Sequence, residues 1–321
     1  MNSSSSDWSD NCDNGNGRGP TPLADLAARG TIPGMSNEVD VEAVVTAVKQ
    51  STKYGDTSEA TIRELAAEAV RQHKKSKPAI KAVRARLHSI MAPYLGDPDY
   101  AAETARLDAA FTAKDDAAIE AICRDCLNAH LSTQERLPIL AEFYELIFAI
   151  TGRPQSIMDI ACGLNPLALR WMGLGSVSSE QLAVSSERPV PGLRFYAYDI
   201  HEPRIAFINH YFRLEGLPEL AKVQDVAMEF PQEQADVALF LKEMPRFERN
   251  YGGRGRPLLE SLHAKFLVIS YPTISTHGGR NLTNRYREFM FQLIQGHDWP
   301  VTELLFDGEL VFVIEKRLEI G

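Results

Sequence analysis

The spacing of apolar residues divides the chain into two parts. From residue 39 to about 150, apolar side chains recur every three or four positions, as at Val41, Val44 and Val45, which is the period of an amphipathic helix. No alternation of apolar and polar residues, the pattern of a half-buried strand, interrupts this part. We therefore predict five or six helices here, the last of them from residue 134 to about 150.

After Pro154, short apolar runs alternate with amphipathic segments. Seven runs are predicted to be strands: 157–161, 193–198, 222–226, 237–241, 266–271, 301–306 and 310–315. The first five, with helices between them, predict an α/β fold with a doubly wound parallel sheet. Asp307-Gly308 separates the last two and is a turn signal, so these two should form an antiparallel hairpin. By fold analogy, a Rossmann-like sheet closed by such a hairpin is the layout of class I methyltransferases rather than of dinucleotide dehydrogenases.

Three segments follow from this division. Residues 1–36 are of low complexity, and we predict a flexible tail because they have too little apolar surface to order themselves. Residues 37–151 are predicted to form a helical domain. Residues 152–321 are predicted to form the α/β domain.

Composition changes this picture little. With 321 residues, 44% of them hydrophobic and 24% charged, the chain has material for one large or two ordinary globular domains. It contains no run of about 18 apolar residues, and its N-terminus lacks the basic and apolar regions of a secretion signal. We therefore expect a cytoplasmic protein with no membrane association.

The four cysteines, Cys12, Cys123, Cys126 and Cys162, are too few and too scattered for a disulfide framework. Cys123 and Cys126 with His130 invite a zinc interpretation, but a closed tetrahedral site needs four ligands and no second Cys/His pair is suitably spaced. We therefore expect two reduced thiols on adjacent turns of a helix, and no metal.

The formal net charge of −9 argues against a protein that coats nucleic acid by bulk electrostatics. Residues 71–86 are the exception, because they hold seven basic side chains and no acidic one. Five of these are candidates for contacts with RNA phosphates: Lys74, Lys75, Lys77, Lys81 and Arg84. The last three fall on one face by helical spacing. A solvated charged face is the alternative, but surface helices usually mix both signs, which favours RNA.

In a doubly wound sheet, a ligand binds beyond the carboxyl ends of the strands, at the topological switch point. A tight turn with one glycine, Gly163, follows the first predicted strand, and carboxylates stand at the ends of the next two, at Asp199 and Asp225. Asp199 suits two ribose hydroxyls, and Asp225 suits the amino group of adenine. These positions predict a nucleotide-like cofactor.

The glycine pattern narrows the cofactor. A dinucleotide site needs Gly-x-Gly-x-x-Gly, whose second glycine admits a pyrophosphate, but here Gly163 is followed by Asn165-Pro166. S-adenosylmethionine has no phosphate to accommodate, so we predict this cofactor, with Lys242 and Glu243 beside the transferred methyl group. The alternative is an ordinary strand-to-helix turn without a ligand, and the two carboxylates argue against it.

Several motifs occur in an order that resembles one family. They are Asp-Ile-Ala-Cys-Gly-Leu-Asn-Pro at 159–166, His-Leu-Ser-Thr-Gln-Glu-Arg-Leu-Pro at 130–138, Leu-Lys-Glu-Met-Pro at 241–245 and Tyr-Pro-Thr at 271–273. Together they resemble the aminoglycoside-resistance 16S rRNA methyltransferases, from about residue 51 to Lys316. The resemblance implies a helical domain that docks on rRNA and a Rossmann-like catalytic domain. It also implies that the chain methylates N7 of guanine 1405 on the assembled 30S subunit and so confers aminoglycoside resistance. We expect the chain to act as a monomer.

The resemblance further implies roles for individual residues. Arg136 would bind the carboxylate of the cofactor through its planar guanidinium. Asp199 would bind the ribose, and Asp225 with Val226 the adenine. The other residues expected to line or adjoin this pocket are His130, Ala161, Gly163, Ile200, Leu241 and Lys242. The alternatives are a surface charge for Arg136 and a helix-end hydrogen bond for His130.

Guanine N7 carries a lone pair and no proton, so the implied reaction needs no general base and depends mainly on positioning. A base inside a folded rRNA helix must first be extruded, at a cost on the order of a few kcal/mol that protein contacts must offset. Two segments, after the fourth and fifth strands, are expected to supply such contacts. Their candidate residues are Arg246, Arg249, Arg280 and Leu282. Solvated charged loops are the alternative.

The chain departs from the family pattern after the fifth strand. The family commonly has Pro-Thr-Lys-Ser and then Lys-Gly-Met, where this chain has Pro-Thr-Ile-Ser at 272–275 and Arg-Asn-Leu at 280–282. Ile274 removes one expected phosphate contact, while Arg280 keeps the charge and Leu282 the apolar bulk. Two other functions therefore stay open: methylation of another RNA or a small molecule, and a non-catalytic RNA-binding or assembly role.

Overall fold

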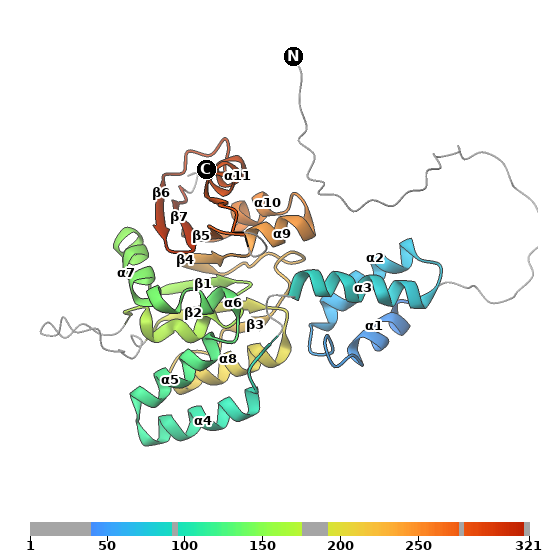
Figure 1. Ribbon diagram of the computed structural model, residues 1–321, viewed down its shortest axis with the longest axis horizontal. Helices are drawn as coiled ribbons and strands as arrows, with labels where there is room; N and C mark the ends of the chain where they lie inside the picture. The colour runs from blue at the N-terminus through green and yellow to red at the C-terminus, as the bar shows by residue number, and fades with distance from the viewer. Residues whose placement is uncertain (1–39, 92–95, 175–191, 276–278, 318–321) are drawn as a thin grey trace, which may run out of the picture. The chain divides into compact units, whose positions relative to one another are not determined.

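Helices form the first part of the chain. The computed structural model describes residues 40–91, 96–174, 192–275 and 279–317. Before the first strand, its α-helices are α1 (Val41–Lys49), α2 (Glu59–Gln72), α3 (Ser76–Met91), α4 (Tyr100–Ala113), α5 (Asp116–Leu127), α6 (Leu131–Gln134) and α7 (Leu140–Thr151) (Figure 1). The predicted helical region is therefore confirmed, with one more helix than the upper expectation among the described residues.

The first three helices have a hydrophobic core of their own. Asp40 and Ser58 cap α1 and α2, since their side chains accept hydrogen bonds from backbone N–H groups in the first turn. The apolar faces of the three helices meet through residues such as Val48, Ile62 and Val83. The basic side chains predicted on α3 lie on its other, exposed side.

We predicted a helix from residue 134 to about 150, and the predicted start of this helix is wrong. The structure has the short α6, then a 3-10 turn at Leu137–Ile139, and α7 begins only at Leu140. Pro138 has no N–H and its ring crowds the preceding turn, so it fits the start of a 3-10 turn but not the interior of an α-helix. Arg136 lies in this interrupted segment and is buried.

A seven-stranded sheet forms the second part of the chain. Its strands are β1 (Ser156–Ile160), β2 (Arg194–Asp199), β3 (Ala221–Val223), β4 (Gln234–Leu241), β5 (His263–Pro272), β6 (Val301–Phe306) and β7 (Glu309–Glu315). They lie in the order β3-β2-β1-β4-β5-β7-β6. The strands β1 to β5 are parallel, and β7 runs antiparallel to both β5 and β6. The predicted class I methyltransferase fold with its C-terminal hairpin is confirmed.

The connections differ from the prediction of a helix after each parallel strand. A 3-10 helix at Asn165–Trp171 follows β1, with Pro166 in its first turn, and residues 175–191 lie outside the described residues. Residues 224–233, between β3 and β4, contain no helix, because this connection is shorter than the roughly dozen residues that a helical crossover needs. The α-helices described in this part are α8 (Glu202–Leu214), α9 (Met244–Tyr251), α10 (Gly255–Ser261) and α11 (Thr283–Leu293).

Alternate residues of the strands enter two hydrophobic cores. On one face, Ile157 and Phe195 pack with α4, α5, α7 and α8. On the other face, Met158 and Phe240 pack with α9, α10 and α11. The chain changes from helix to strand near Thr151, as predicted. However, α4, α5 and α7 share a hydrophobic core with the sheet, whereas α1 to α3 form a separate core.

Cys123 and Cys126 lie on adjacent turns of α5 as free, buried thiols, and burial raises the pKa of both. The predicted tail and Cys12 lie outside the described residues. Within the described ranges, no group of His, Cys, Asp or Glu side chains is placed to hold a metal ion. None of the helices that the structure describes is long and apolar enough to cross a membrane.

Candidate functional site

Two residues with unusual backbone geometry mark the switch point of the sheet. Ala161 directly follows β1 and Lys242 directly follows β4, and these two strands are neighbours. Their φ angles are 51° and 61°, in a region that residues other than glycine rarely adopt. Gly163, with φ 54°, continues the turn after β1. Strain of this kind concentrates at functional sites, where the surrounding structure holds it in place.

A cavity of about 630 Å³, including its open mouth, lies beyond these strand ends and is called here the larger cavity. Asp199, which ends β2, and Asp225, which follows β3, supply carboxylates to it. Its apolar walls come from Ile90, Met91, Ile200, Val226, Phe240 and Phe247. An apolar cleft with a few well-placed polar groups is the usual composition of a cofactor pocket.

A second, smaller cavity adjoins the first, since Ala161 lines both. Most of its other lining residues are polar: Ser132, Thr133, Arg136, Asp159 and Asn165, with Cys162 and Leu241 beside them. The two cavities together suit a ligand with one aromatic end and one charged end. Three residues expected near the pocket, His130, Gly163 and Lys242, do not line either cavity. Gly163 and His130 bond to lining residues, Asp199 and Thr133.

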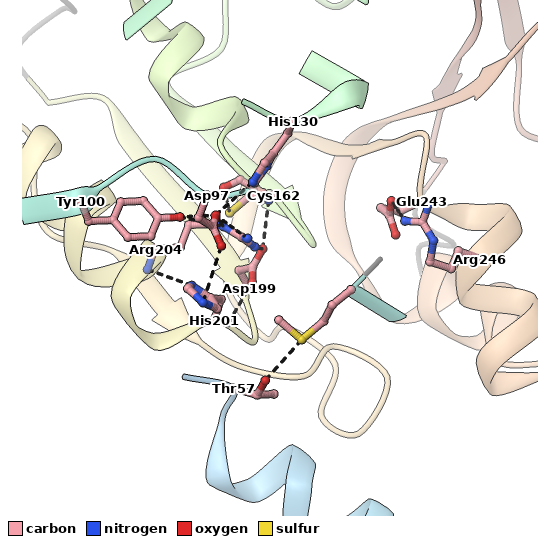
Figure 2. A network of polar contacts seen from close by, with 12 residues as sticks. Thr57, Asp97, Tyr100, His130, Cys162, Asp199, His201, Arg204, Glu243 and Arg246 are labelled. Atoms are coloured by element: carbon pink, nitrogen blue, oxygen red, sulfur yellow. Dashed lines mark hydrogen bonds and ion pairs between the residues drawn. The ribbon is translucent and has the colours of Figure 1, made fainter. Parts of the chain in front are cut away.

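The Asp199 carboxylate is held by three hydrogen bonds (Figure 2). Its Oδ2 accepts from the Gly163 N–H at 3.1 Å and from Arg204 Nη1 at 2.8 Å, and its Oδ1 accepts from the His201 N–H at 2.9 Å. A carboxylate offers about four acceptor positions, and donors among the described residues use three of them. Asp199 is thus oriented in the wall of the larger cavity, and its expected bonds to the two ribose hydroxyls stay a prediction.

Asp225 is held in a similar way. It accepts a hydrogen bond from the Ala227 N–H at 3.0 Å and from the Tyr251 hydroxyl at 3.2 Å. Burial raises its pKa, and these two bonds oppose the rise. Tyr251 lies on α9, where the neighbouring Asn250 accepts a hydrogen bond from Arg86 of α3 at 3.1 Å. The basic helix is therefore bonded to the wall that holds Asp225.

Arg136 lines the smaller cavity but already has a carboxylate partner. Its Nε and Nη2 donate to Glu309 at 3.1 Å and 2.6 Å, and its Nη1 donates to Asn165 Oδ1 at 3.2 Å. The surface-charge alternative for Arg136 is wrong, because the residue is 1% exposed. A cofactor carboxylate would have to share this guanidinium with Glu309, a partner that the sequence did not indicate.

Of the two residues expected beside the methyl group, the structure places Glu243 at the larger cavity. Burial raises the pKa of Glu243 to about 7, and the nearby Arg246 opposes the rise. Lys242 points elsewhere: its Nζ lies 2.7 Å from Glu135 Oε2 and 3.2 Å from Glu309 Oε2. Lys242 therefore belongs to the buried charge cluster around Glu309.

Asp159 begins the motif that indicated the cofactor. It lines the smaller cavity, and its Oδ2 accepts a hydrogen bond from Asn165 Nδ2 at 2.8 Å. Burial raises the pKa of Asp159 to about 8, although the Asn165 bond and the charge of Arg136 oppose the rise. A cationic group bound in the smaller cavity would stabilise the ionised form of this carboxylate.

Two residues of the site, Arg204 and Asp97, were not predicted from the sequence. Arg204 lines the larger cavity. Asp97 does not line it, but accepts a hydrogen bond from Arg204 Nη2 at 2.9 Å. His130 is the N-cap residue of α6, but its side chain does not bond to the helix end as the alternative expected: its Nε2 lies 3.0 Å from Asp97 Oδ1. Figure 2 shows these three side chains gathered beside Asp199. Only the tertiary fold brings them together.

The predicted RNA-contacting residues are mostly at the surface. Exposed side chains among them are Lys74, Lys75, Lys77, Lys81, Arg84, Arg249 and Arg280. Arg246 instead lines the larger cavity and pairs with Glu243. Leu282 was expected to offer apolar bulk to RNA, but it is buried at the start of α11, where its N–H bonds to the Thr273 carbonyl at 2.8 Å. Residues 276–278 of the same loop lie outside the described residues.

Comparisons with known proteins point to one kind of enzyme. Residues 50–313 match the family model described as ribosomal RNA methyltransferase (FmrO). The chain is 32% identical to the 16S rRNA (guanine(1405)-N(7))-methyltransferase of Micromonospora echinospora, over 86% of this chain and 97% of that one. The protein of the same name from Serratia marcescens is 31% identical, over 87% and 100%. Among solved structures, 16S rRNA methyltransferase RmtF in complex with S-adenosyl-L-homocysteine has a TM-score of 0.70 and 28% identity, over 88% of this chain and 100% of that one.

Proposed function

The chain belongs to the ribosomal RNA methyltransferase family, and from this premise we propose that it methylates N7 of guanine 1405 in 16S rRNA, with S-adenosylmethionine as methyl donor. The relatives from Micromonospora echinospora and Serratia marcescens are named for that activity, and both match along most of this chain. The family match confirms the resemblance found in the motifs. The observation that carries the proposal is the pair of cavities that share Ala161 as a lining residue.

The residues of the two cavities fit the two ends of S-adenosylmethionine. In the larger cavity, the Asp199 carboxylate suits the ribose, and Asp225 with the apolar walls suits an adenine. In the smaller cavity, Asp159 suits the amino group of the methionine end, and Arg136 with Asn165 suits its carboxylate. The similar RmtF structure contains the demethylated form of this molecule, S-adenosylhomocysteine.

When bound, S-adenosylmethionine supplies a methyl group on a positively charged sulfur. Guanine N7 has a lone pair and no proton, so no side chain has to remove a proton from it. Asp199 and Asp225 would hold the donor, and the apolar walls would exclude water from the reacting centre. Glu243 and Arg246, paired at the larger cavity, would orient the extruded base. Catalysis then comes mainly from approach and orientation.

Docking on RNA would involve the exposed basic face of α3. Lys77, Lys81 and Arg84 are exposed on this helix, while Ile90 and Met91 at its end line the larger cavity. Phosphate contacts along the helix would therefore lead the RNA toward the mouth of the cavity. We propose that a monomer docks in this way on the assembled 30S subunit.

Methylation of purified subunits tests the proposal. The protein is incubated with labelled S-adenosylmethionine and either unmethylated 30S subunits, naked 16S rRNA or transfer RNA. We expect label in the 30S subunits, and expression in a susceptible bacterium should raise the aminoglycoside concentration it tolerates. Label in naked RNA but not in 30S subunits would replace the proposed substrate by another RNA. Binding of S-adenosylhomocysteine without transfer to any RNA would favour a non-catalytic role.

A further inference from the structure

An aspartate outside both cavities is bonded to the residue that holds Asp199. Asp97 lies in the link between α3 and α4, and its side chain is 21% exposed. Its Oδ1 lies 2.9 Å from Arg204 Nη2 and 3.0 Å from His130 Nε2, and the Tyr100 hydroxyl donates to the same oxygen. Figure 2 shows these side chains converging beside Asp199.

Arg204 divides its guanidinium between two carboxylates. Nε and Nη2 face Asp97 at 3.3 Å and 2.9 Å, whereas Nη1 donates to Asp199 at 2.8 Å. Arg204 is 2% exposed, and a buried guanidinium requires partners for its charge and its N–H groups. Because Asp97 occupies the Nε side, Arg204 meets Asp199 at one point. The Asp199 Oδ1 accepts from the His201 N–H at 2.9 Å, and the Asp199 side chain lines the larger cavity.

The charge states of the neighbours keep this arrangement in place. Burial opposes ionisation of Asp97, but the bond from His130 and the charge of Arg204 outweigh it and lower the pKa of this carboxyl. Burial lowers the pKa of His130, so a neutral ring that donates from Nε2 suits the anionic Asp97. His201, whose Nε2 lies 3.7 Å from Asp97 Oδ2, also has a pKa lowered by burial.

We propose that Asp97 is a positioning residue of the cofactor site, which acts through Arg204 to orient the Asp199 carboxylate toward the ribose of S-adenosylmethionine. The inference rests on the proposed function, because it takes that cofactor as the ligand of the larger cavity. Without the charge of Asp97, Arg204 turns its Nε side to Asp199. A two-point ion pair then uses the Oδ1 position that the ribose needs.

Asp97 lines neither cavity, so its loss should weaken cofactor binding without slowing methyl transfer once the cofactor is bound. Asp97→Asn keeps the size of the side chain and removes its charge. Asp99→Asn is the matched control, because Asp99 caps α4 through two backbone N–H groups and asparagine caps a helix about as well. Both variants are made in the full chain.

Calorimetry with S-adenosylhomocysteine is the first measurement. We expect the Kd of Asp97→Asn to rise about tenfold and that of Asp99→Asn to stay within about twofold of the original chain. In methylation of 30S subunits, the KM of Asp97→Asn for S-adenosylmethionine should rise by a similar factor. Its kcat at saturating cofactor should stay within about twofold, since only binding is affected.

Equal affinity of Asp97→Asn and the original chain for S-adenosylhomocysteine would overturn the proposal. The proposal would also be overturned if kcat at saturating cofactor fell as much as kcat/KM. That result is expected if Asp97 only stabilises the fold. If thermal melting finds Asp97→Asn unfolded, Tyr100→Phe removes one hydrogen bond to Asp97 and should weaken binding about fivefold. Unchanged binding by Tyr100→Phe would equally overturn it.

Failure of the proposed function would look different. If the original chain binds S-adenosylhomocysteine but methylates no 30S subunit, the proposed substrate is wrong and calorimetry still decides the role of Asp97. If the original chain does not bind S-adenosylhomocysteine, the proposed cofactor is wrong, and the positioning role falls with it.

Discussion

Arg136 and Glu309, 173 residues apart in the chain, form a buried two-point ion pair at the smaller cavity. Each side chain is 1% exposed. The pair joins the interrupted segment between α6 and α7 to the first residue of β7. One wall of the smaller cavity is thereby fixed to the antiparallel hairpin, and Arg136 is oriented before a ligand arrives.

Removing the charge of Glu309 should destabilise the fold. Glu309→Gln leaves Arg136 and Lys242 buried without their shared carboxylate, and breaking a buried pair in this way costs roughly 3–5 kcal/mol. Urea denaturation measures the change in the free energy of unfolding. Glu315→Gln, at the exposed end of the same strand, is the control and should change it by less than about 0.5 kcal/mol. Similar values for the two variants would contradict the role of the pair.

The sequence predicted the part of the site that lies at strand ends. Asp199 was found because an apolar run reveals where its strand stops, and parallel strands place their carboxyl ends together. The third strand was predicted at 222–226 but ends at Val223, so Asp225 follows it rather than lying within it. Glu309 and Asp97 were missed because their partners are distant in sequence and no local spacing encodes such pairs. The break in the last predicted helix had a local signal, Pro138, that the apolar period concealed.

Asp159 should make the fold lose stability as the pH rises. Burial raises its pKa to about 8 from an ordinary value of 3.8, so its contribution is fully present below about pH 4 and is lost as the pH rises to about 8. The slope reaches at most about 1.4 kcal/mol per pH unit. Asp159→Asn keeps an acceptor for Asn165 without this titration. The free energy of unfolding of the original chain minus that of Asp159→Asn should fall as the pH rises from 5.5 through 7 to 9. A difference that stays constant over this range would contradict the assignment.

Asp199→Ala should abolish measurable binding of S-adenosylhomocysteine in calorimetry. The variant loses a charged acceptor in the cavity and the bonds that hold Gly163 and His201, so we expect a loss of roughly 100-fold or more. Glu202→Ala, three residues further on and exposed, is the control and should bind normally. Retained affinity in Asp199→Ala would contradict the assignment of the larger cavity.

Charge reversal on α3 should weaken 30S binding alone. The triple change Lys77→Glu, Lys81→Glu and Arg84→Glu removes candidate phosphate contacts, so affinity should fall at least about tenfold and depend less on salt. Affinity for S-adenosylhomocysteine should not change, because these side chains do not line the cavities. Sedimentation with 30S subunits measures the first quantity and calorimetry the second.

The matched control reverses three exposed basic residues near the amino ends of parallel strands, at the sheet edge opposite the cavities: Arg153, Arg194 and Lys265. It changes the net charge by the same amount. If both triple variants lose 30S affinity equally, bulk charge rather than the α3 face governs docking.

Mapping the modified base tests the central claim most directly. Unmethylated 30S subunits, and matched subunits that carry adenine in place of guanine 1405, are incubated with the protein and S-adenosylmethionine, and their 16S rRNA is then cleaved chemically at N7-methylguanine. The account predicts cleavage at position 1405 in the first preparation and no new cleavage in the second. Cleavage at another guanine, or equal methyl incorporation into both preparations, would contradict it.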